Sequence, residues 1–180
     1  MRFLGSRQAA EWATAQGVEV DARGLPAQIP PGFENVQFLL PQTPGQVAWL
    51  CRFISECLSP REMCLLWITE TDVSPSSENW HLYYRVRQSY QDHQLLYEAP
   101  GHLFLDYEEP DFITFLQIGL LAGWDMHLIP RLAYGVADTA RAFVSHDEWI
   151  VLLHRDKSVV QEWRKTLDHA HLRTRAAGAA

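Results

Sequence analysis

Apolar residues recur along the chain in two alternating patterns, one typical of helices and one of strands. The clearest helical stripe comprises Val47, Leu50, Cys51, Ile54 and Leu58. The Thr43-Pro44-Gly45-Gln46 segment predicts where this helix begins, because threonine caps helices, proline suits the first helical position and glutamine can cap backwards. We expect further helices over residues 6–16, over residues 112–122 after Glu109-Pro110-Asp111, and from Ser158, which we expect to cap the last helix.

Short apolar runs between these helices predict the strands of a sheet. Residues 63–69 are continuously apolar up to Thr69, which is typical of a central strand buried on both faces. Shorter strands are expected at 36–40, 102–106 and 124–129, and residues 143–153 predict an antiparallel hairpin. Alternation of these elements predicts an α/β or α+β fold, with a mixed sheet that ends in a C-terminal antiparallel hairpin and is covered by four to five helices.

Residues 75–90 fit two interpretations. Apolar residues from Trp80 to Tyr90 alternate as in a strand, but Pro75-Ser76-Ser77-Glu78-Asn79 is typical of a helix start. We predict a helix.

Pro26, Pro30 and Pro31 interrupt regular structure between Gly24 and Gly32. We therefore expect an N-terminal helix and Pro-rich arm at 1–32, a single globular α/β domain at 33–171, and a flexible, small and basic tail at 172–180.

Composition narrows the classes of partner. The formal net charge is −7, which disfavours nucleic acid and membrane surfaces and permits a basic protein partner. The cysteines Cys51, Cys57 and Cys64 form no CxxC pair and are expected to be free thiols. We expect a cytoplasmic protein, because no secretory signal is recognised and the longest apolar stretch is too short to span a bilayer. No phosphate loop or dinucleotide fingerprint is present, and we expect no cofactor.

Two surfaces suit a protein partner. Trp80, Tyr84 and Arg87 are residue types that anchor interfaces, although core packing explains such a segment as well. An acidic group consists of Asp106, Glu108, Glu109 and Asp111. This group would steer a basic partner toward the protein, although negative charge at the start of a helix also stabilises the helix itself. His146, Asp147 and Glu148 lie at the predicted hairpin tip, where they either bind or simply form a turn.

A metal site is the alternative for the second half of the chain. Asp125 and His127 are two residues apart on a predicted strand, so they share a face, and His146 would complete a set of ligands for zinc or iron. Glu148 would then serve as a general base in a metal-dependent hydrolase. The competing interpretation is that Asp125 accepts backbone or indole hydrogen bonds. A serine hydrolase is disfavoured, because neighbouring Ser145 and His146 point to opposite faces and no GxSxG precedes them.

The segments Ser76-Ser77-Glu78-Asn79, Pro100-Gly101-His102, Gly123-Trp124-Asp125 and Ser145-His146-Asp147-Glu148 are similar to those of small uncharacterised bacterial proteins of the immunity-protein type. The resemblance covers about Met63 to Arg155 and implies a cytoplasmic protein that neutralises a toxin by binding it. It implies no catalytic residues. We therefore expect a non-enzymatic protein-binding module, with the metal-dependent hydrolase and a small-ligand sensor as alternatives.

Overall fold

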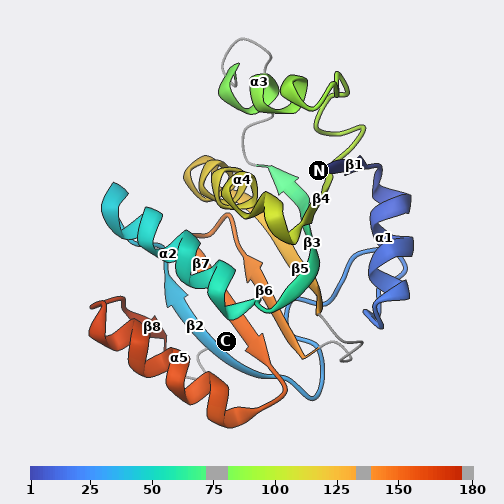
Figure 1. Ribbon diagram of the computed structural model, residues 1–180. Coiled ribbons are helices and arrows are strands. Elements are labelled where there is room, and N and C mark those ends of the chain that lie inside the picture. The colour runs from blue at the N-terminus through green and yellow to red at the C-terminus, as the bar shows by residue number, and fades with distance from the viewer. Residues whose placement is uncertain (72–80, 133–138, 176–180) are drawn as a thin grey trace.

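A computed structural model describes residues 1–71, 81–132 and 139–175 of the protein. Within these ranges eight strands form one sheet in the order β1-β4-β3-β5-β6-β7-β2-β8, and every pair of neighbours is antiparallel (Figure 1). The strands are β1 (Arg2–Leu4), β2 (Glu34–Leu39), β3 (Arg61–Thr71), β4 (Gly101–Leu105), β5 (Trp124–Leu132), β6 (Ala140–Val144), β7 (Trp149–His154) and β8 (Thr174–Arg175). The helices are α1 (Ser6–Ala15), α2 (Pro44–Cys57), α3 (His81–Ser89), α4 (Glu109–Ala122) and α5 (Lys157–His169), with a 3₁₀ turn η1 (Asp106–Glu108) before α4.

Both faces of the sheet are covered, but unequally. Helices α2, α4 and α5 lie over one face and bury the larger core, to which β3 contributes Leu66 and β5 contributes Met126 (Figure 1). Successive strand residues point to opposite faces, so Leu65 and Trp67 reach the other face and pack under α1. The remainder of that face holds a smaller cluster around Phe143.

The predicted fold class is confirmed, as an α+β fold with a C-terminal hairpin and five helices in the described ranges. Antiparallel pairing extends across the whole sheet. The helix predicted after Trp80 is present as α3, whereas its predicted start at 75–79 and Trp80 itself lie outside the described residues.

The predicted N-terminal cap of α2 is confirmed, and a glycine ends α4. The Thr43 hydroxyl oxygen accepts a hydrogen bond from the backbone N–H of Gln46, and Gly123 ends α4 in the left-handed conformation at a φ of 66°. The cap predicted for the last helix was wrong: Asp156 is the N-cap of α5, because its carboxylate accepts the backbone N–H of Ser158 at 2.8 Å.

The two chain ends are more integrated than the sequence suggested. Strand β1 pairs with β4, and Ala9 and Ala13 of the predicted N-terminal helix are fully buried beside Trp67, so this part of residues 1–32 belongs to the sheet and its core. Leu172 is also buried, and β8 pairs with β2, so residues 174–175 extend the sheet at its opposite edge.

All three cysteines are free, as predicted. Burial raises the pKa of Cys51 and Cys64 to about 12, which makes both thiols unreactive at neutral pH. Among the described residues, none of the helices has the length and apolar content required to span a bilayer.

Candidate functional site

Asp125 and His146 meet at the end of the sheet where β5 begins and the β6–β7 hairpin turns. The backbone N–H of His146 donates to Oδ1 of Asp125 at 2.6 Å, and Nδ1 of the same imidazole lies 2.8 Å from that oxygen. A carboxylate can only accept, so Nδ1 carries a proton and Nε2 holds the lone pair when the ring is neutral. Asp125 thereby fixes both the hairpin backbone and the orientation of the imidazole.

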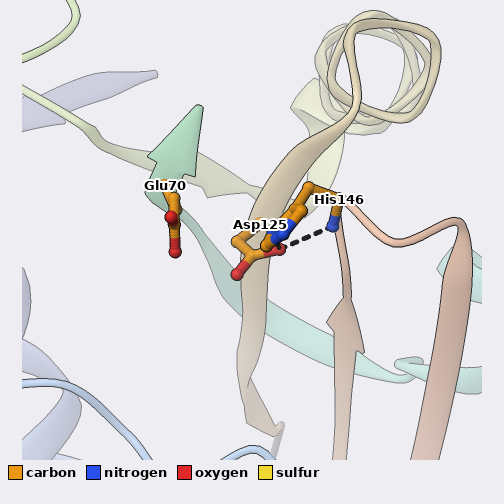
Figure 2. Close-up of side chains that lie close together, drawn as sticks. All are labelled: Glu70, Asp125 and His146. Atoms are coloured by element: carbon orange, nitrogen blue, oxygen red, sulfur yellow. Dashed lines mark hydrogen bonds and ion pairs between the residues drawn. The ribbon is translucent and has the colours of Figure 1, made fainter. Parts of the chain in front are cut away.

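Glu70 joins this pair from β3. Each of Glu70, Asp125 and His146 offers one ligand atom, and these atoms lie within 4.8 Å of one another. Figure 2 shows the His146 side chain lying against Asp125, with Glu70 set apart on the neighbouring strand. Asp125 is buried, His146 half-buried and Glu70 exposed, so Glu70 is the member with the most freedom to move.

A β-bulge decides which β3 residue faces Asp125. Ile68 pairs with Met126 and Glu70 pairs with Asp125, so Thr69 is the extra residue. An uninterrupted ladder would have placed Thr69 opposite Asp125, because side chains alternate strictly between the two faces. The bulge therefore turns Glu70 toward Asp125, and this is why sequence periodicity did not identify it.

His127 shares a face with Asp125, as predicted, but the cluster contains Glu70 in its place. Its ring packs against Phe143 with the centroids 4.8 Å apart, and the residue is 6% exposed. Burial, assisted by the positive charge of Arg141, lowers the pKa of His127 to about 4. The ring is consequently neutral at physiological pH.

Whereas His146 lines another pocket, the two carboxylates of the cluster line a pocket of about 520 Å³ on the face that α2, α4 and α5 leave free. Glu70, Asp125, His127 and Phe143 line it from the sheet, and residues between Glu19 and Gln28 line it from the opposite side. We call it the acidic pocket. Of its acidic side chains, Asp21 pairs with the nearby Arg23 at 3.0 Å. The chain matches no protein-family model, no curated protein and no solved structure.

Arg87, predicted to anchor a partner, is completely buried. It forms an ion pair with Asp92, donates from Nη1 to the Tyr83 hydroxyl at 2.7 Å, and lies 4.4 Å above the ring of Phe3. Tyr83 in turn bonds Nε2 of His102 at 2.9 Å. This network ties α3 to β4, so Arg87 stabilises the fold and presents no surface to a partner.

Its companions in that prediction differ in accessibility. Tyr84 is half-buried, and its hydroxyl oxygen accepts the backbone N–H of Leu96 at 3.3 Å. Trp80 lies outside the described residues.

Most of the acidic group around η1 is also engaged within the protein. Glu108 is buried and accepts the backbone N–H of Leu105 at 2.8 Å. Glu109 accepts the Ser55 hydroxyl and lies 3.5 Å from Nη2 of Arg61, while Asp111 accepts the Tyr90 hydroxyl. Only Asp106 of the four is exposed, which favours the interpretation as a helix start.

The three residues predicted at the hairpin tip differ in role: His146 belongs to the candidate site, and Asp147 and Glu148 form the turn. Asp147 and Glu148 are exposed, and their backbone N–H groups bond to Ser145, as in an ordinary turn. Glu148 lines a separate pocket beside α2 and α4, together with His146. Glu148 is not among the residues that line the acidic pocket, and it shares this other pocket with the proposed ligand His146.

Proposed function

We propose that the protein is a metal-dependent hydrolase whose divalent ion is held by Glu70, Asp125 and His146. The observation that carries this proposal is the convergence of two carboxylates and an imidazole, of which Glu70 and Asp125 line the acidic pocket. Such a ligand set suits zinc, manganese or iron(II). The predicted alternative is thereby retained, with Glu70 in place of His127.

The present arrangement resembles a site that has to close around its ion. Ligand atoms around a tetrahedral zinc ion lie about 3.3 Å apart, because each is about 2 Å from the metal. Separations of up to 4.8 Å therefore require the exposed Glu70 side chain to approach Asp125 and His146. The backbone N–H of His146 donates to Oδ1 of Asp125 at 2.6 Å, and this hydrogen bond orients the carboxylate toward the ion.

Each residue then has a distinct role. His146 would offer Nδ1, which lies 2.8 Å from Oδ1 of Asp125 and would give up its proton when the ion binds. The second carboxylate oxygen of Asp125 and the carboxylate of Glu70 supply negative charge that a divalent ion neutralises. When bound, the metal lowers the pKa of a coordinated water and so supplies hydroxide at neutral pH.

The first test is metal binding by protein purified without a histidine tag. We expect about one zinc or manganese ion per chain by elemental analysis, and calorimetric affinity at least tenfold weaker in Glu70→Gln and His146→Ala. Glu62→Gln is the matched control, since Glu62 is an exposed carboxylate on the same strand that pairs with Arg131 instead. Substoichiometric metal, or equal affinity in Glu70→Gln and Glu62→Gln, would contradict the site.

The second test addresses hydrolysis. Activity against ester, amide and phosphoester panels should disappear with a chelator, return with the metal and be lost in Glu70→Gln but not in Glu62→Gln. A metal-loaded protein without any such activity would leave a binding site and refute the enzyme.

We also propose, as a second candidate, a protein-binding module that neutralises a basic toxin. Exposed Asp106 beside Tyr107, which is 78% exposed, supports it, together with the acidic net charge. This role would be supported if the protein captures a basic partner, and if the capture weakens with added salt and in the double variant Asp106→Asn/Tyr107→Ala. Equal capture by the wild type and the double variant would contradict a role for this surface.

A further inference from the structure

A second pocket adjoins the acidic pocket. It has a volume of about 530 Å³. Three aromatic side chains line it, Trp67, Tyr84 and Tyr97, and Leu96, Pro100 and Glu70 lie beside them. We call it the aromatic pocket. Leu25, Thr69 and Glu70 line both pockets, so the two are neighbours across the end of β3. The volume lies within the range of small-molecule sites, about 300–1,000 Å³.

The walls of the aromatic pocket combine rigid and accessible parts. Trp67 is 2% exposed and Leu96 is 5% exposed, so both are fixed by the core. The hydrogen bond from the Leu96 backbone to the Tyr84 hydroxyl joins α3 to the following loop. Tyr97, at 75% exposed, forms the open side. A ligand group would bury apolar area here without reorganising the fold.

The charge at this site is one-sided. Among the described residues that line the aromatic pocket, Glu70 carries the only formal charge, and no ion pair among the described residues includes it. Asp125 adds a second carboxylate nearby. Aromatic ring faces are themselves electron-rich and attract cations. Rings and carboxylates thus favour a positive ligand and disfavour an anion.

We infer that the aromatic pocket binds a small organic cation, an aromatic or alkyl amine whose apolar body lies among Trp67, Tyr84 and Tyr97 and whose ammonium group faces Glu70. This inference does not require the proposed hydrolase activity, because the pocket and its charge exist without a metal.

The test compares three probes of similar size: 2-phenylethylamine, 2-phenylethanol and 3-phenylpropionate. Chemical-shift titrations of the full chain are made with a chelator present, so that metal binding does not contribute. We expect the amine to bind about two- to fivefold more tightly than the alcohol, as for a partly exposed charge pair, and the anion to bind most weakly. The preference should decrease as salt is added.

Two variants separate the charge from the aromatic wall. Glu70→Gln should abolish the preference for the amine and retain binding of the alcohol, whereas Glu62→Gln should leave both unchanged. Tyr97→Ala should weaken binding of the amine about two- to fivefold. Tyr107→Ala is the matched control, since Tyr107 is similarly exposed, at 78%, and is not among the residues lining the pocket. Absence of binding for all three probes, or an amine preference that survives Glu70→Gln, would overturn the inference.

Discussion

At the residue scale, buried polar side chains account for much of what the sequence left open. Arg87 and Tyr83 are residue types that often anchor interfaces, yet both are fully buried and form hydrogen bonds to each other and to neighbouring residues. Their burial is tolerated because the network supplies partners: Asp92 matches the guanidinium, and His102 accepts from the tyrosine hydroxyl as its Nδ1 donates to the Pro100 carbonyl at 3.0 Å. Residue type alone does not distinguish these two uses of Arg and Tyr.

Two buried histidines predict a dependence of stability on pH. Burial lowers the pKa of His127 to about 4 and that of His102 to about 3, below the value of 6.5 for a solvated histidine. As pH falls below 6.5, the unfolded chain takes up these protons and the folded chain does not, so the free energy of unfolding decreases. The contribution of His127 is fully present above pH 6.5 and is lost by about pH 4.

His127→Gln isolates one of these groups. The gap between 6.5 and about 4 corresponds to about 3 kcal/mol. Between pH 7 and pH 4, the free energy of unfolding should therefore decrease by about 3 kcal/mol less in His127→Gln than in the wild type, as measured by denaturant unfolding. His169→Gln, at an exposed position of α5, is the control. An unchanged pH profile for His127→Gln would show that the folded and unfolded proteins bind this proton at the same pH, so that burial does not lower the pKa of His127.

At the element scale, contacts between α4 and β5 hold Asp125 in place. The last turn of α4 ends at Gly123, and β5 follows immediately with Trp124 and Asp125. At Gly119 of α4, an added Cβ would clash with Sδ of the fully buried Met126 on β5. Glycine is needed there for space.

Gly119→Ala is therefore expected to destabilise the protein by about 1–3 kcal/mol, measured by urea unfolding, because the buried Met126 side chain has little room to move. Gly45→Ala in α2 is the control, since its added Cβ has nothing within 4 Å and should be neutral or slightly stabilising. Adding Met126→Val to Gly119→Ala should give a smaller loss than the sum of the two single losses. Strict additivity would contradict the proposed clash.

At the scale of the whole molecule, the N-terminal segment completes the sheet. The segment predicted as an N-terminal helix and Pro-rich arm at 1–32 contains β1, which covers the edge of β4, and the predicted helix α1, which buries Leu65, Trp67 and Ile129. Without it an apolar face and an unpaired strand edge would meet solvent. The proline-rich connection was recognised correctly as a break in regular structure, but a break in the chain does not imply separation in space.

Removing residues 1–32 tests this integration. We expect the shortened chain to lose more than about 3 kcal/mol of unfolding free energy, from the exposed apolar area, and to bind a hydrophobic dye. Ala9→Asp, which places a carboxylate at a fully buried position, should also destabilise the full chain. A shortened chain that unfolds cooperatively with unchanged stability would show that the segment is a separable arm after all.

Local chemistry in the sequence determined the helices, their start and end residues at α2 and α4, the C-terminal hairpin and the shared face of Asp125 and His127, because each depends on neighbours within a few positions. The tertiary structure alone decided that Glu70, and not His127, joins Asp125 and His146 in the candidate site. Glu70 and His146 reach Asp125 through strand pairing and a hairpin turn, and the β3 bulge reverses the side-chain alternation that periodicity assumes. Strand pairing between residues far apart in the sequence produces no local sequence pattern, and neither does the extra residue Thr69 that shifts the register of β3.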